Sequence, residues 1–376
     1  MLAAGTAAAA TMSAALIGTP VMAPAIRAEY DISLSQLGVV LSGMWIGPLF
    51  TLLPWGILAD RIGERLVLAS GIGLCGCFLV GAAFAPGWVA LTVLLALAGA
   101  AGTSTNSASG RAVMAWFDAG ERGLALGVRQ AAIPVGGAVA ALMLPTIVDA
   151  GGIEAAFLVL AGLCVAGAAV AAVVVRDRPG APSEVEEAPS VLRDVRLWRV
   201  ALSGGFYLVA QVTVTGFVVL FLHDERGLSN ARAAAVLAAV QVLAVAARIA
   251  AGRWSDVVRS RVRPLRLVGL ASAAALGVTA AVLASPLWIV VPAFVVAGTL
   301  SMAWNGLAFT AAAEVAGARR SGAAIGFQQT VLSGVGAVVP AAFAVAVTAT
   351  SWQVAFAGAA LFPVVGWYGL RPLTGR

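Results

Sequence analysis

The chain has 376 residues, of which 61% are hydrophobic and only 11% are charged, and its mean hydropathy is +0.98. Soluble proteins carry about 25% charged residues, so this chain has too little charge to cover a soluble surface. Apolar runs of about 20 residues recur along the whole length, and each can cross a bilayer. The composition therefore predicts a polytopic membrane protein and excludes a soluble protein with one N-terminal signal or anchor.

The apolar runs predict twelve helices in two sets of six. The first set covers 3–26, 36–58, 66–85, 88–116, 122–148 and 154–175, and the second covers 197–222, 230–252, 264–284, 287–314, 321–347 and 352–370. A proline-containing, charged stretch separates the sets. We expect an N-terminal six-helix bundle over 1–178, a cytoplasmic linker over 179–196 and a C-terminal six-helix bundle over 197–376. The first helix begins almost at Met1 with no polar tail, which leaves the completeness of the N-terminus open.

The break between the second and third runs carries a recognisable pattern. From Gly56 to Arg65 it reads Gly-Ile-Leu-Ala-Asp-Arg-Ile-Gly-Glu-Arg. Every named position of this stretch resembles the signature loop G-x-L-x-D-R-x-G-x-R of the major facilitator superfamily. The resemblance implies an all-α secondary transporter with twelve transmembrane helices in two pseudo-symmetric bundles. It also implies a gating or latch role for the loop residues, which are Gly56, Asp60, Arg61, Gly63 and Arg65.

The two sets of helices repeat one another. With an offset of 196, Gly56 and Asp60 fall on Gly252 and Asp256, and with an offset of 199, Gln130 falls on Gln329. Repeats of this kind place the substrate site at their interface, near the middle of the membrane. We assign three further residues to gating with the signature loop: Arg253 and Asp256 in its weaker copy, and Arg111 near the end of the fourth helix.

Arg129 is the most informative charged residue inside the predicted spans. It lies eight residues past Glu121, about 12 Å into its helix at about 1.5 Å per residue. Gln130 follows it, and the repeat-related places hold Gln328 and Gln329. A guanidinium donates paired hydrogen bonds to a carboxylate, and amides orient the rest of a solute. This set predicts an anion-binding cavity. The alternative is that Arg129 binds backbone carbonyls or pairs with Asp60 or Glu121.

Three other residues are assigned to the same cavity. Asn106 and Asn305 recur through the repeat, and Trp304 precedes the second of them. Their alternative role is packing between helices.

Arg248 and Glu314 are the remaining ionisable residues of the spans. Each is costly to bury alone, so we expect a structural ion pair between them. The alternative is that Glu314 carries a coupling proton.

These residues together predict secondary active transport of a small organic or inorganic anion. The chain has no nucleotide-binding loop, so the energy must come from a gradient, with the proton as the expected coupling ion. The alternative is proton-coupled efflux of drugs or hydrophobic metabolites, although the corresponding motifs of drug antiporters are incomplete.

An enzyme, a cofactor, a metal site and nucleic-acid binding are not expected. We expect a monomer in the cell inner (plasma) membrane with both termini cytoplasmic, because the arginines gather on one side of the alternating helices.

Overall fold

The computed structural model describes residues 2–105, 122–176, 191–317 and 320–373, with their side chains except at 2–5, 60, 122–129 and 191. All regular elements within these ranges are helices. The first half contains α1 (Leu2–Val21), α2 (Ala23–Glu29), α3 (Leu34–Ile62), α4 (Glu64–Ala83), α5 (Trp88–Gly102) and α7 (Arg122–Val174). The second half contains η1 (Val191–Arg193), α8 (Val195–Asp224), α9 (Asn230–Val257), α10 (Val262–Val282), α11 (Leu287–Met302), α12 (Asn305–Ala316), α13 (Ser321–Ala349), α14 (Trp352–Gly369) and η3 (Arg371–Leu373).

The described helices confirm the prediction of twelve passes. Helices α1 and α2 form one pass that bends by 59°. Helix α7 makes two passes, because Gly151 and Gly152 depart from helical geometry and Gly152 adopts a φ of +69°. Helices α11 and α12 together make one pass, which breaks at Ala303 and Trp304. The sequence predicted one continuous helix over 287–314 for the pass made by α11 and α12. The structure differs from that prediction by the break at Ala303 and Trp304.

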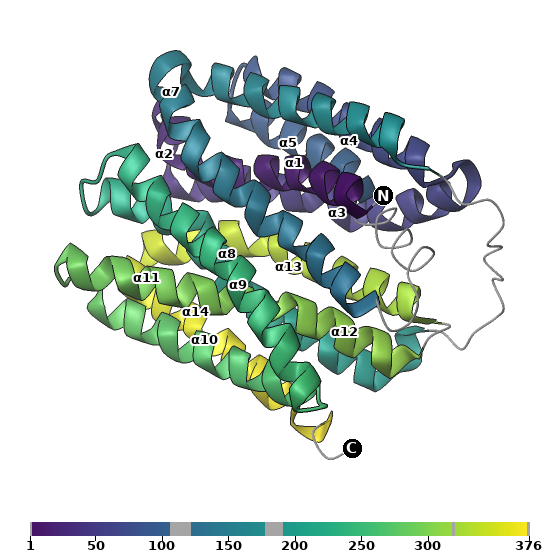
Figure 1. Cartoon of the computed structure of the whole chain (residues 1–376). Helices are drawn as coiled ribbons and strands as arrows, with labels where there is room; N and C mark the ends of the chain where they lie inside the picture. The colour runs from purple at the N-terminus through teal and green to yellow at the C-terminus, as the bar shows by residue number, and fades with distance from the viewer. Residues whose placement is uncertain (1, 106–121, 177–190, 318–319, 374–376) are drawn as a thin grey trace.

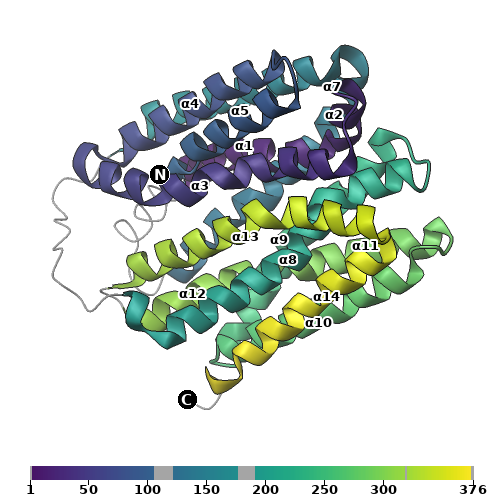
Figure 2. The same ribbon diagram turned by 180° about the vertical axis from the view of Figure 1, so that it is seen from behind.

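Helices α1 to α7 gather on one side of the molecule and α8 to α14 on the other (Figure 1). The reverse view shows the same division (Figure 2). We call one end of the bundle the turn end, since it carries the turns at 30–33, 84–87, 225–229 and 349–351. The opposite end, which carries the turns at 63 and 258–261 and the start of α8, is the linker end.

The signature loop makes a tight turn at the linker end. Gly63 ends α3 and precedes α4 with a φ of 91°, in a region that residues with a Cβ rarely adopt. A glycine at this place is therefore required by the backbone itself.

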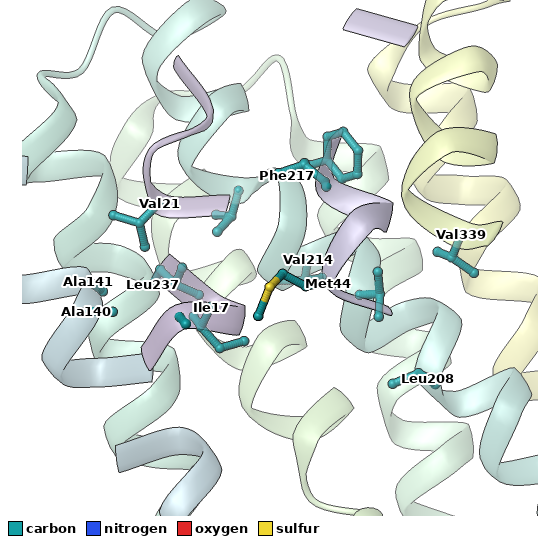
Figure 3. Packing of buried hydrophobic residues seen from close by; sticks show 14 of the residues in the cluster. Ile17, Val21, Met44, Ala140, Ala141, Leu208, Val214, Phe217, Leu237 and Val339 are labelled. Carbon is teal, nitrogen blue, oxygen red and sulfur yellow. The ribbon is translucent and has the colours of Figure 1, made fainter. Parts of the chain in front are cut away.

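A single cluster of buried apolar side chains joins the two sides of the molecule. Side chains of α1, α3 and α7 meet those of α8, α9 and α13 (Figure 3). The residues that the figure labels are Ile17, Val21, Met44, Ala140, Ala141, Leu208, Val214, Phe217, Leu237 and Val339.

Polar contacts and close helix packing also join the two sides at the turn end. Arg27 Nη1 lies 2.6 Å from Asp224 Oδ2. The hydroxyls of Ser35 and Thr348 lie 3.4 Å apart. Along the same pair of helices, α13 packs against Gly38 of α3 with no room for a Cβ between them.

Candidate functional site

Arg248 occupies the centre of the candidate site. It lies in α9 and its surface is only 8% exposed. Its Nε donates to Met302 O at 2.9 Å, its Nη1 to Gln130 O at 2.6 Å, and its Nη2 to Asn305 Oδ1 at 3.0 Å. The guanidinium therefore contacts the first half of the chain through Gln130 and the second half through the other two residues.

The carbonyl of Gln130 is available because of a proline. In an α-helix this carbonyl accepts from the N–H four residues later, but that residue is Pro134, which has no N–H. The carbonyl would be buried without a donor if Arg248 did not reach it from α9. The sequence of α7 thus creates a hydrogen-bond acceptor inside the membrane span.

The other two acceptors come from the break between α11 and α12. Helix α11 ends at Met302, and the last carbonyls of a helix have no partner within it. Helix α12 begins at Asn305, whose amide oxygen lies beside the freed carbonyl of Met302 on the same guanidinium. The break thus supplies two oxygens to one guanidinium.

All three acceptors of Arg248 are neutral. Among the side chains that the structure describes, no carboxylate lies in hydrogen-bond contact with this guanidinium. Its three hydrogen bonds use three of five N–H groups, so two remain for another acceptor. A buried cation without a counter-ion is energetically costly and marks a functional site in a membrane protein.

The predicted ion pair between Arg248 and Glu314 is wrong. Glu314 Oε1 instead accepts from Arg261 Nε at 2.9 Å, and Arg261 also pairs with Asp256. The reason is depth. Arg248 lies nine residues before the end of α9 at Val257, about 14 Å at about 1.5 Å per residue, whereas Glu314 lies two residues before the end of α12.

A cavity of about 80 Å³ lies between the two sides of the molecule and is lined by Gln130, whose carbonyl binds Arg248; Arg248 itself is not among the lining residues. A single water needs roughly 10–15 Å³, so the cavity has room for several waters or a small solute. Its polar lining includes Ser13, Thr103, Gln130, Gln329 and Ser333. Its apolar lining is Ala9, Met12, Leu16, Met44, Trp45, Pro48 and Ile133. The cavity is thus suited to a small solute with both polar and apolar parts.

The residues predicted to bind substrate fall into three groups. Gln130 and Gln329 line the cavity, and Asn305 binds Arg248. Trp304 and Gln328 are fully buried and are absent from its lining; the Nε1 of Trp304 and the amide of Gln328 have no hydrogen-bond partner among the described residues. Asn106 and the side chain of Arg129 lie outside the described part of the chain, so their roles stay predictions.

The residues predicted to form the gate lie at the linker end. Gly63 makes the turn between α3 and α4, and Gly56 lies in α3 with open space around it. Arg61, Arg65 and Arg253 are exposed, and Asp256 pairs with Arg261. Arg111 and the side chain of Asp60 lie outside what the structure describes. The latch role therefore stays a prediction.

Sequence reasoning missed two features of the site. It did not find the contact between Arg248 and Gln130, although Pro134, four residues after Gln130, was the signal for a free carbonyl. It also missed Trp45, which lines the cavity and packs on Gly336 of α13. No sequence pattern marks that contact, since the two residues are far apart in the chain.

The chain matches the family model described as Major Facilitator Superfamily over residues 2–341. It is 33% identical over 351 residues to the uncharacterized MFS-type transporter Rv2994 of Mycobacterium tuberculosis (strain ATCC 25618 / H37Rv), covering 92% of this chain and 79% of that protein. The hexuronate transporter of Bacillus subtilis (strain 168) is 25% identical, covering 63% of this chain and 60% of that protein.

Another relative is the probable sulfoacetate transporter SauU of Cupriavidus necator (strain ATCC 17699). It is 30% identical over 169 residues, which cover 45% of this chain and 39% of that protein. Among solved structures, a bacterial homologue of the human lysosomal transporter Spinster, in an inward-facing and unoccupied conformation, matches with a TM-score of 0.78 and 16% identity. That match covers 98% of this chain and 96% of the other, and it supports the fold alone.

Proposed function

Because this chain belongs to the Major Facilitator Superfamily, we propose that it carries a small organic anion across the membrane, with Arg248 as the fixed positive charge of its binding site. A superfamily member moves its solute by exposing one central site to each face of the membrane in turn. The site described above lies between the two sides of the molecule, where such a solute must bind.

The observation that carries this proposal is the buried, unneutralised guanidinium. Arg248 is held by neutral oxygens only, so the site has a net positive charge among the described side chains. A low-dielectric surrounding strengthens its attraction for an anion, and its two remaining N–H groups can bind a carboxylate or sulfonate. A cation or a neutral lipophile would gain nothing from this charge.

The composition of the cavity and the names of relatives support the same substrate class. The lining combines polar side chains such as Gln130 with Trp45 and other apolar side chains. This favours an anion that also has carbon atoms over a small inorganic ion. Two relatives bear the names of organic anions, hexuronate and sulfoacetate.

We keep Arg129 as a second predicted contact for the anion, because it directly precedes Gln130 in α7. We also place the linker end on the cytoplasmic side of an inner membrane, since most arginines of the helix ends lie there. Both statements extend the proposal beyond the charge at Arg248.

Binding to the purified protein in detergent tests the proposal. Glucuronate and sulfoacetate serve as anions, glucose as the neutral counterpart of glucuronate, and choline as a cation. We expect one of the anions to raise the melting temperature and the other two compounds to leave it unchanged, because ligand binding stabilises the folded state. Arg248→Gln should weaken anion binding at least tenfold, and Arg248→Lys should weaken it less, because lysine keeps the charge but loses the paired donors.

Arg263→Gln is the matched control, since Arg263 is an exposed arginine of the neighbouring helix α10. It should bind the anion as the parent does. If choline or glucose stabilises the protein as well as the anions do, the anion proposal fails and the efflux alternative replaces it. Normal anion binding by folded Arg248→Gln would equally remove Arg248 from the site.

A further inference from the structure

We infer that this transporter works as an anion exchanger, in which Arg248 lets the two sides of the molecule reorient readily only while an anion is bound. This inference rests on the proposed function and adds the mode of transport to it. It follows from the hydrogen bond between the guanidinium and the carbonyl of Gln130.

That hydrogen bond joins the two moving parts. Arg248 belongs to α9 on one side of the molecule, and its Nη1 donates at 2.6 Å to the carbonyl of Gln130 in α7 on the other side. Both residues are buried. Alternating access moves one set of helices against the other around the central site, so a contact that joins the two sets there must loosen when they move.

Breaking this bond in the empty protein is costly. The guanidinium would lose one acceptor inside the membrane, and the carbonyl of Gln130 would lose its donor, because Pro134 cannot supply one. No described carboxylate contacts Arg248 to take over the charge. A bound anion offsets the first of these two costs, since its oxygens can replace the carbonyl on the guanidinium. The loaded protein should therefore reorient faster than the empty one.

The ion pair between the two sides at the turn end lacks this property. Arg27 and Asp224 pair at the turn end with side chains that are 41% and 24% exposed. Water can solvate both groups when they separate, so an anion in the central cavity makes no difference to the cost of breaking this pair. Among the described polar contacts between the two sides, the one at Arg248 is the one whose cost of breaking a bound anion changes.

Flux through the purified protein in liposomes tests the inference. The labelled anion is sulfoacetate, or glucuronate if that anion raises the melting temperature more. Its entry is measured into vesicles that contain the same anion unlabelled and into vesicles that contain no anion. We expect entry to be at least tenfold faster with the anion inside. Entry into empty vesicles at the same rate, with or without a proton gradient, would overturn the exchange mode.

Asn305→Asp is a more specific test in the same experiment. The new carboxylate would replace the amide oxygen that lies 3.0 Å from Arg248 Nη2, and it would neutralise the guanidinium in the empty protein. We expect weaker anion binding and a ratio of exchange to net entry that falls toward one. Asn305→Ser adds no charge and should keep the ratio even where total flux falls. A ratio that stays unchanged in Asn305→Asp would overturn the role of the uncompensated charge.

Arg27→Gln is the second control, because it breaks a contact between the two sides without touching the cavity. It should keep the ratio of exchange to net entry of the parent protein.

The proposed function and the exchange mode fail in different ways. If no anion binds, the proposed function is wrong. If an anion binds through Arg248 but net entry equals exchange, only the exchange mode is wrong.

Discussion

At the scale of single residues, Gly336 sets how closely α13 approaches α3. A Cβ at this place would overlap the indole ring of Trp45, which lines the cavity. Gly336→Ala should therefore push the ring away and destabilise the packed state by about 1–3 kcal/mol, as overpacking does. The measurement is the melting temperature of the purified protein, which should fall.

Gly326→Ala is the matched control for this substitution. Gly326 lies in the same helix with open space where its Cβ would be placed, so the alanine should leave the melting temperature unchanged or raise it slightly. If Gly336→Ala melts at or above the temperature of the parent, Trp45 does not pack on Gly336 in the stable form of the protein.

Single residues also show what the sequence can and cannot predict. The turn at Gly63 was predictable, since a glycine in a short charged break between two apolar runs is typical of a tight turn. The environment of Arg248 was not, because its partners come from three helices, and Gln130 lies 118 positions away. Glu314 was an available partner by charge, but its depth near the end of α12 excluded it. Opposite charge alone is therefore a poor basis for predicting ion pairs in a membrane protein, because two residues can pair only if they lie at similar depth.

At the scale of elements, the interrupted helices supply the site. The break between α11 and α12 had no proline or glycine at Ala303 and Trp304 to announce it, so the sequence predicted a continuous helix. Pro134 in α7 was visible in the sequence, but the donor that reaches the carbonyl it leaves free was not. Both irregularities free a carbonyl, and Arg248 binds both. The helices were predictable from hydropathy. The partner of each free carbonyl was not, because it lies on a neighbouring helix whose packing the sequence does not show.

Pro134→Ala tests this use of a helix irregularity. The new N–H can donate to the carbonyl of Gln130 and compete with Arg248 Nη1 for it. The guanidinium would then be freer to bind an anion. A hydrogen bond to a charged group is worth about 1.5–3 kcal/mol, and sharing the carbonyl recovers part of that. We expect anion binding to tighten by up to about tenfold, since 1.4 kcal/mol is a factor of about ten.

Calorimetric titration with glucuronate or sulfoacetate measures this change. Pro145→Ala is the control, because Pro145 lies in the same helix but about three turns beyond Ile133, the last residue of α7 that lines the cavity. Its affinity for the anion should equal that of the parent. Unchanged or weaker binding by Pro134→Ala would show that the carbonyl of Gln130 does not limit the guanidinium.

At the scale of the whole molecule, the two sides are held together at the turn end by apolar packing and by one exposed ion pair among the described residues. The apolar cluster is continuous between them, so closure at this end does not depend on charge alone. The pair of Arg27 and Asp224 adds a small bias. Exposed pairs are worth about 0.2–1 kcal/mol, which changes a population by less than about tenfold.

Removing that pair should increase the fraction of molecules that open at the turn end. We expect Asp224→Asn to raise the labelling of a cysteine at Ser13, which lines the cavity and is buried here, by up to about fivefold. The label is a membrane-impermeant thiol reagent applied from the side of the turn end, and labelling of the parent chain is subtracted. The double variant Arg27→Asp with Asp224→Arg should restore low labelling, and raised ionic strength should reduce the difference between parent and Asp224→Asn. If labelling does not change, or if the charge swap labels like Asp224→Asn, then the apolar cluster alone holds this end closed.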